Sequence, residues 1–156
     1  MKKILIVFYS RSGYTRKVAE HIATVCKADT EEIRDVKSRK GFFGYFRSGY
    51  EASKMTLAKI EPAVANPANY DVLVLGGPVW AGKMASPIRT YITQHCDEAK
   101  AIALFCTYGG SGAEKVLREM EKLSEKKALA AIAITDDEIK KQRYQDKLEQ
   151  LVKAVT

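Results

Sequence analysis

Cysteine is scarce in this sequence, and long hydrophobic runs are absent. The three cysteines, Cys26, Cys96 and Cys106, are far apart among the 156 residues and form no C-x-x-C pair. A disulfide framework or a zinc site would need closer or more numerous ligands, so we interpret them as small core residues of a protein in a reducing compartment. The longest uninterrupted apolar run covers residues 128–134, which is too short to span a bilayer. The sequence therefore excludes a disulfide scaffold and predicts no membrane span.

A targeting signal is also missing. Two lysines precede the apolar residues 4–9, as in a signal peptide, but this apolar core is too short and no small-residue cleavage pattern follows it. We therefore expect a cytoplasmic protein. The length and the composition, 46% hydrophobic and 29% charged, fit one folded domain over residues 1–156. Only the formal net charge of +7 is unusual.

Short apolar segments alternate with helical patterns along the chain. A more polar segment, 30–34, fits an edge strand. Almost continuous apolar character, typical of strands buried on both faces of a parallel sheet, is found in residues 4–9, 71–75, 101–106 and 130–134. Helical periodicity covers residues 15–27, 87–95, 113–126 and 136–154. This alternation predicts an α/β fold with a five-stranded parallel sheet and helices on both faces.

The segment after the first predicted strand has the chemistry of an anion site. Ser10, Ser12 and Thr15 bring three hydroxyl groups to the start of a helix, and Gly13 allows a tight turn. Free backbone N–H groups and the helix dipole favour an anion at such a position. A single hydroxyl would be an ordinary helix cap. Three hydroxyls within six residues, directly after a buried strand, favour phosphate binding.

Two further predicted strands end in turn-rich sequences. Residues 76–83 place Trp80 among glycines and a proline, which we interpret as an open loop whose indole can stack on a flat ring. Tyr108 has the same character within residues 107–112, although a half-buried loop tyrosine is the simpler interpretation when it is taken alone. In an open parallel sheet such loops lie at the carboxyl ends of the strands, where ligands bind.

Other nucleotide-binding motifs do not fit these loops. Residues 77–83 nearly match a Walker A motif, but Met84 stands where a hydroxyl must bind Mg²⁺, and Pro78 has no N–H for phosphate. A dinucleotide fingerprint fails because G-x-G-x-x-G does not follow the first strand. No acid–base pair, nucleophile or cluster of metal ligands stands out, so we predict no catalytic side chain and no metal site.

The three segments together resemble the flavodoxin family over nearly the whole chain. The resemblance rests on Y-S-R-S-G-Y-T at 9–15, G-P-V-W-A-G at 77–82 with Pro87, and T-Y-G-G at 107–110. It implies a flavodoxin-like three-layer sandwich of the short-chain type, with strand order 2-1-3-4-5 and FMN as cofactor. The phosphate would bind at residues 10–15, and the isoalloxazine ring would lie between Trp80 and Tyr108. The implied cofactor-binding residues are Ser10, Arg11, Ser12, Gly13, Tyr14, Thr15, Pro78, Val79, Trp80, Ala81, Gly82, Lys83, Thr107, Tyr108, Gly109, Gly110 and Gly112.

The positive charge is concentrated in one segment. From Arg34 to Lys59 the chain carries seven cations, two carboxylates and five of its 14 aromatic residues. Typical flavodoxins are acidic around the flavin, so this segment departs from the family. It could bind single-stranded nucleic acid, cover the core with its cations in solvent, or form a wall near the flavin that binds an anionic or aromatic substrate or an acidic protein. We favour the third interpretation, because the segment follows the second strand, and we do not expect a nucleic-acid partner.

The sequence therefore predicts an FMN-binding redox protein that transfers electrons through its flavin, with a redox partner protein or a small substrate near Arg34 to Lys59. The alternative is an NAD(P)H-dependent oxidoreductase acting on a quinone or a similar acceptor. A more remote alternative is a flavin-free domain that binds nucleic acid or a phosphoprotein. The small residues that follow Trp80 also lead us to the hypothesis that the peptide around Ala81 and Gly82 faces the flavin N5.

Overall fold

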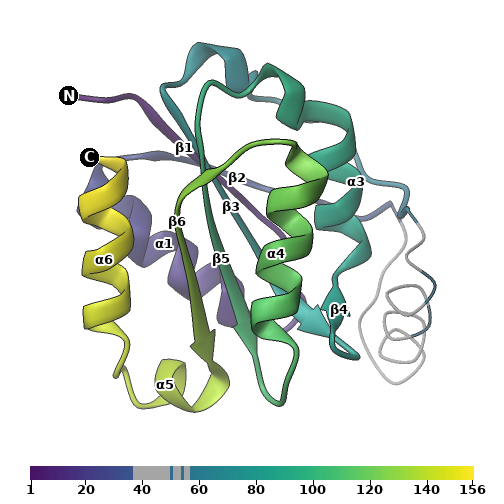
Figure 1. Ribbon diagram of the computed structural model, residues 1–156, viewed down its shortest axis with the longest axis vertical. Coiled ribbons are helices and arrows are strands. Elements are labelled where there is room, and N and C mark those ends of the chain that lie inside the picture. The colour runs from purple at the N-terminus through teal and green to yellow at the C-terminus, as the bar shows by residue number, and fades with distance from the viewer. Residues whose placement is uncertain (37–49, 51–53, 55–56) are drawn as a thin grey trace.

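In the described part of the chain, five parallel strands form the centre of the fold (Figure 1). The computed structural model describes residues 1–36, 50, 54 and 57–156. The strands are β1 (Ile4–Phe8), β2 (Asp29–Glu32), β3 (Val72–Trp80), β5 (Ile102–Tyr108) and β6 (Ala128–Thr135), and a short β4 (Lys83–Met84) pairs antiparallel with β3. Their order across the sheet is β2-β1-β3-β5-β6. Counted over the parallel strands, this is the predicted order 2-1-3-4-5, which is therefore confirmed.

Helices cover both faces of the sheet and give the predicted three layers (Figure 1). One face is covered by α3 (Ser86–His95) and α4 (Ala113–Ser124), and the other by α1 (Tyr14–Cys26), α5 (Asp136–Lys140) and α6 (Gln145–Val155). Short 3-10 helices span Pro67–Asn69 and Cys96–Glu98. None of the described helices combines the length and the apolar character needed to cross a bilayer.

The inner strands are apolar throughout because they supply side chains to two cores. In β1, Leu5 and Val7 enter the core beneath α3 and α4, whereas Ile4 and Ile6 enter the core beneath α1 and α6. Alternate residues of a strand point to opposite faces, so a strand covered on both faces needs no polar positions. β2 lies at the edge of the sheet and is polar and partly exposed, as the sequence predicts.

The helix predicted over residues 136–154 is two helices, and this part of the prediction is wrong. α5 begins with a capping box between Thr135 and Glu138 and ends after one short turn. Gln142 then has a left-handed φ of 54°, and the Arg143 N–H donates to the Glu138 carbonyl at 2.8 Å. This backbone bond closes a helix C-terminus. The chain turns here, and α6 starts after Tyr144. Tyr144 is buried, and its hydroxyl oxygen is hydrogen-bonded to Nδ1 of His21 at 3.1 Å.

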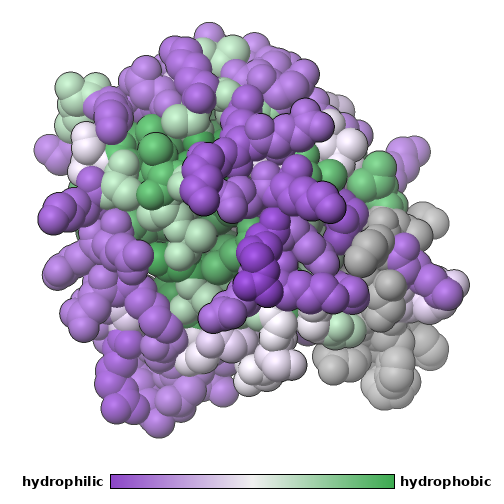
Figure 2. All heavy atoms as spheres, viewed as in Figure 1, coloured by the Kyte–Doolittle hydropathy of each residue, from purple (hydrophilic) through white to green (hydrophobic). Residues whose placement is uncertain are grey.

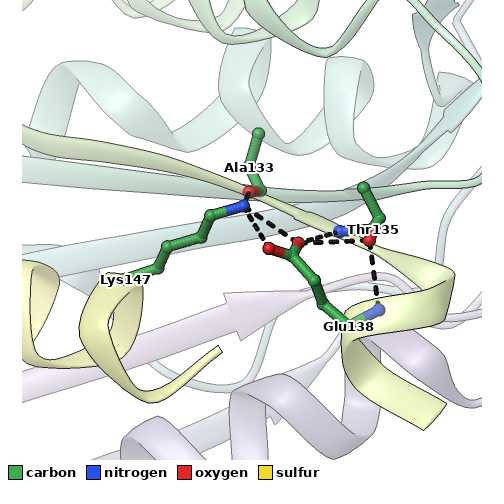
Figure 3. A network of polar contacts seen from close by, with 4 residues as sticks. All are labelled: Ala133, Thr135, Glu138 and Lys147. Carbon is green, nitrogen blue, oxygen red and sulfur yellow. Dashed lines mark hydrogen bonds and ion pairs between the residues drawn. The ribbon is translucent and has the colours of Figure 1, made fainter. Parts of the chain in front are cut away.

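Strand β6 is an edge strand of the sheet, and charged side chains form hydrogen bonds with its backbone groups at both ends. At the start of β6, the Ala128 N–H donates to the Glu121 carboxylate at 2.7 Å. At its end, the Lys147 ammonium donates to the Ala133 carbonyl at 2.8 Å, and the Thr135 N–H donates to Glu138 at 2.8 Å (Figure 3). Hydrophobic residues are exposed along β6 between α4 and α6 (Figure 2), and Leu129 among them is 47% exposed.

Candidate functional site

Three loops meet at the carboxyl edge of the sheet. β1, β3 and β5 are parallel neighbours, so the segments that follow them emerge on the same side. These segments are residues 9–13, the β3–β4 hairpin and residues 109–112. They contain the residues that the sequence singled out as a candidate binding site. The structure therefore brings together three segments that are far apart in the sequence.

The first loop leaves the N-terminus of α1 without a side-chain cap. Gly13 occupies the cap position with a φ of 98°, and its N–H donates to the Ser10 hydroxyl at 3.1 Å. Ser12 is exposed, and Arg11 and Ser10 are half-buried. The ordinary-cap interpretation of these hydroxyls therefore does not hold, because none of them bonds to the first N–H groups of the helix. Those groups are the donors that an anion at a helix N-terminus uses.

Thr15 points inward and joins the first loop to the third. Its hydroxyl oxygen lies 2.8 Å from the hydroxyl oxygen of Thr107, at the end of β5, and both residues are about 2% exposed. A buried hydroxyl needs such a partner, because an unpartnered one carries a desolvation cost. This bond fixes the start of α1 against the end of β5.

The second loop is a strand and a tight hairpin, so the prediction of an open loop over residues 76–83 is wrong. β3 continues to Trp80, the turn contains only Ala81 and Gly82, and Lys83 starts β4. Both turn residues have left-handed φ values, 48° and 69°, as in the two-residue turns that suit the twist of a hairpin.

The glycines and the proline that resembled a loop have structural reasons to lie in β3. A Cβ on Gly76 would fall 1.9 Å from the ring of Phe105, so only glycine leaves room for that side chain. Pro78 pairs with Thr107 of β5, but the pairing with β1 has already ended at Gly76. The missing N–H of the proline is therefore tolerated, because no β1 residue pairs with it there.

Trp80 is a buried residue rather than an open loop residue. It is 6% exposed and meets the ring of Tyr9 edge-to-face, with ring centres 5.4 Å apart. The Arg11 guanidinium lies 5.8 Å from the Trp80 ring. Trp80 thus joins the first loop to the hairpin. Sequence reasoning missed Tyr9 as its partner, although Tyr9 ends the first apolar run.

The third loop touches the hairpin through two glycines. Gly112 has a φ of 93°, and a Cβ on it would lie 2.8 Å from the Cα of Gly82 and 2.9 Å from the Gly82 carbonyl oxygen. A Cβ on Gly109 would lie 3.0 Å from a carboxylate oxygen of Asp136, a neighbour that the sequence did not indicate. Tyr108, the last residue of β5, is half-buried. The close approach of the two loops therefore depends on the absence of a side chain at position 112.

The titratable groups near the site do not form a catalytic pair in the described residues. Burial raises the pKa of Cys106, near the end of β5, to about 12, so this thiol is a poor nucleophile at neutral pH. The Lys115 ammonium beside Lys83 lowers the pKa of Lys83. Within the described ranges, no three histidine, cysteine or acidic residues gather as metal ligands would. Most of the basic segment from Arg34 to Lys59 lies outside the described residues, so its predicted role stays a prediction.

The donor set suits a phosphate ester that carries a flat ring. Hydroxyl and backbone N–H donors gather at the start of α1, and aromatic residues lie at the ends of β3 and β5. A Cβ at Gly13, Gly82 or Gly110 would meet no atom of the described residues within 4 Å, so space remains open along all three loops. Binding sites for cofactors combine such open space with a few convergent polar groups.

Comparison with known proteins agrees with this architecture. The flavodoxin family model matches residues 3–153. A flavoprotein from Lactobacillus acidophilus, solved in complex with FMN, has a TM-score of 0.74 and 26% identity, over 90% of this chain and 98% of that one. A second solved structure, from Bacteroides eggerthii, shares the fold with a TM-score of 0.77 and 21% identity, over 97% of this chain and 98% of that one.

One relative of this chain in sequence is an enzyme. The NAD(P)H dehydrogenase (quinone) of Trichlorobacter lovleyi is 31% identical over 101 residues, which are 60% of this chain and 48% of the relative. The match thus spans about half the length of that enzyme. The family match extends over nearly all of the chain, and its residues 3–153 contain every loop of the candidate site. The chain belongs to the flavodoxin family.

Proposed function

We propose that this protein binds FMN and transfers electrons through the bound flavin. The observation that carries this proposal is the convergence of three loops at one sheet edge, where Gly112 lies against Gly82 and Thr15 is bonded to Thr107. The related flavoprotein of Lactobacillus acidophilus, with the same fold, was solved with FMN. When bound, the flavin would supply the redox chemistry, and the protein would hold and orient it.

The phosphate would bind at the start of α1. Its donors would be the N–H groups of Tyr14 and Thr15 in the first turn, together with the Ser10 and Ser12 hydroxyls. Arg11 would add a cation that is always charged. Because Thr15 already shares its hydroxyl with Thr107, we expect its main role to be holding the helix start in place.

The ring system would lie against the other two loops. Thr107, Tyr108, Gly109, Gly110 and Gly112 would form one side. The other side would comprise Pro78, Val79, Trp80, Ala81, Gly82 and Lys83. Since Trp80 packs against Tyr9 and is only 6% exposed, it would meet the flavin ring through the small part of its side chain that reaches the surface. The turn at Ala81 and Gly82 would place backbone polar groups near the flavin.

A titration of the purified protein with FMN tests this proposal. We expect saturable binding of one FMN, seen as quenching of flavin fluorescence, and much weaker binding of riboflavin, which lacks the phosphate. Ser12→Ala should weaken FMN binding and leave riboflavin binding unchanged, because Ser12 lies at the phosphate end. Flavin fluorescence that stays unquenched throughout the titration would contradict the proposal and favour a flavin-free binding domain.

The second candidate function is that of an NAD(P)H-dependent quinone oxidoreductase, which the similarity to the Trichlorobacter lovleyi enzyme favours. A carrier and an enzyme differ in their need for a separate reductase. Oxidation of NADPH by the FMN-loaded protein and a quinone alone, at a steady rate, would establish the enzyme. Reduction only after a separate reductase is added would establish the carrier.

A further inference from the structure

Two lysines from different elements stand side by side next to the candidate site. Lys83 is the first residue of β4, directly after the hairpin turn, and Lys115 lies in the first turn of α4, shortly after Gly112. The positive charge of the Lys115 ammonium lowers the pKa of Lys83, because two like charges close together disfavour the charged form. The contact between Gly82 and Gly112 shows that the two backbones approach closely here.

The surroundings of this pair are positive. The groups that act electrostatically on Lys83 are Lys115, Glu119 of α4 and Arg89 of α3. Glu119 lies 3.4 Å from the Arg89 guanidinium, so its charge is shared. The Arg89 Nε is buried and has no hydrogen-bond partner in the described residues. Three cations therefore surround one carboxylate.

The lysine pair is open to a partner. Lys115 is exposed and Lys83 is half-buried, and hydrophilic side chains cover the outer face of α4 (Figure 2). Glu114, next to Lys115 in the chain, lies 3.8 Å from the Arg118 guanidinium, so its charge is already paired. Like charges held together repel each other, and an added carboxylate between them would relieve that repulsion.

We infer that Lys83 and Lys115, supported by Arg89, form the docking surface for an acidic redox partner protein beside the flavin. The inference rests on the proposed function, because the flavin places the electron at the hairpin next to Lys83. A protein surface is favoured over a small anion because the cations come from three elements, β4, α4 and α3, and Lys115 is exposed. Complementary charge steers such transient complexes and sets their association rate.

The first test is a binding measurement that needs no flavin. Decaglutamate, an acidic probe, is added to the purified protein, and amide NMR shifts are recorded at low ionic strength. We expect the largest shifts at residues 82–83 and 112–119, and their loss in Lys115→Gln. The matched control, Lys122→Gln, changes an exposed lysine at the other end of the same helix and should leave them unchanged. Shifts elsewhere only, or saturable binding of pyrophosphate but not of the peptide, would overturn the inference.

The second test uses the FMN-loaded protein. After photoreduction, its oxidation by the anion ferricyanide and by the cation cobalt(III) tris-phenanthroline is followed by stopped flow. Lys115→Glu should slow the first reaction about threefold or more and speed the second, and both effects should vanish in about 0.5 M KCl. Equal effects of Lys115→Glu and Lys122→Glu would overturn the inference. If FMN does not bind at all, the proposed function fails, whereas the peptide measurement still decides the docking surface.

Discussion

The hydroxyl oxygens of Thr15 and Thr107 lie 2.8 Å apart, and both residues are buried. This single bond connects the first turn of α1 with the last residues of β5. It lies beneath two of the three loops that form the candidate site. Because the hydroxyl groups have no access to water, each depends on the other.

Removing one of these hydroxyls should cost more than removing both. Thr15→Val leaves the Thr107 hydroxyl buried without a partner, and we expect the free energy of unfolding to fall by about 1–3 kcal/mol. In the double variant Thr15→Val and Thr107→Val, most of this loss should be recovered, because two apolar groups of the same shape then face each other. Urea unfolding of the four proteins measures the coupling. Additive losses would show that the bond does not join the loops.

A side chain at position 112 should separate the hairpin from the third loop. Gly112→Ala combines a left-handed φ with a Cβ that would lie 2.8 Å from Gly82, so we expect the free energy of unfolding to fall by about 2 kcal/mol. FMN affinity should fall with it. Gly110→Ala is the matched control for stability, since its Cβ would meet no described atom within 4 Å. Unfolding curves that shift equally for both variants would contradict this account.

The hairpin turn stores backbone strain at Ala81. Its φ of 48° costs a residue with a side chain about 1–2 kcal/mol relative to glycine. Ala81→Gly should therefore stabilise the protein, by less than this amount because glycine also makes the unfolded chain more flexible. Ala85 has an ordinary φ of −61°, so Ala85→Gly relieves no strain and should destabilise the protein by making the unfolded chain more flexible. Thermal unfolding of the two variants should give shifts of opposite sign, and two shifts of the same sign would argue against strain at Ala81.

The contact between Glu138 and Lys147 should make stability depend on acid pH (Figure 3). Burial raises the pKa of Glu138, but hydrogen bonds from Lys147 and Thr135 outweigh it and leave the pKa lowered. A lowered pKa in the folded state adds stability that is complete above the unfolded-state value of about 4.3 and is lost as the pH falls through the folded value. Lys147→Met should lower stability at neutral pH and flatten its decline below about pH 4.3. Urea unfolding at several pH values checks this.

Lys153→Met provides the control for that experiment. Lys153 is exposed in the last turn of the same helix, α6. The substitution removes an equal charge from the same helix, so we expect a change in stability within about 0.5 kcal/mol and an unchanged acid slope. If both variants change the slope alike, the effect comes from net charge and not from the contact with Glu138.

The sequence predicts the sheet well, because the signal for its inner strands is strong. A strand whose side chains enter the cores on both faces of the sheet, such as β1, must be apolar at every position, and this pattern is visible in the sequence. The break between α5 and α6 was missed because the residues around Gln142 are polar, and polar residues fit a solvated helix turn as well as a helix end. The continuation of β3 through Pro78 was missed because the proline is tolerated there only where the pairing with β1 has ended. That end of the pairing is set by another segment of the chain.

The candidate site was predicted from its composition, whereas its internal contacts were not. Hydroxyls, glycines and aromatics at strand ends identify the three loops. The pairing of Trp80 with Tyr9, and of Lys83 with Lys115, depends on which loops the fold brings together.

The side chains that bond to the ends of β6 bear on how the protein behaves at high concentration. An unprotected outer strand of eight residues without a charge is a template onto which a strand of another molecule can add, and repeated addition builds fibres. Here an arriving strand would first have to displace Glu121 from Ala128 and Lys147 from Ala133. The polar contacts in Figure 3 thus act as a barrier to polymerisation as well as a helix cap.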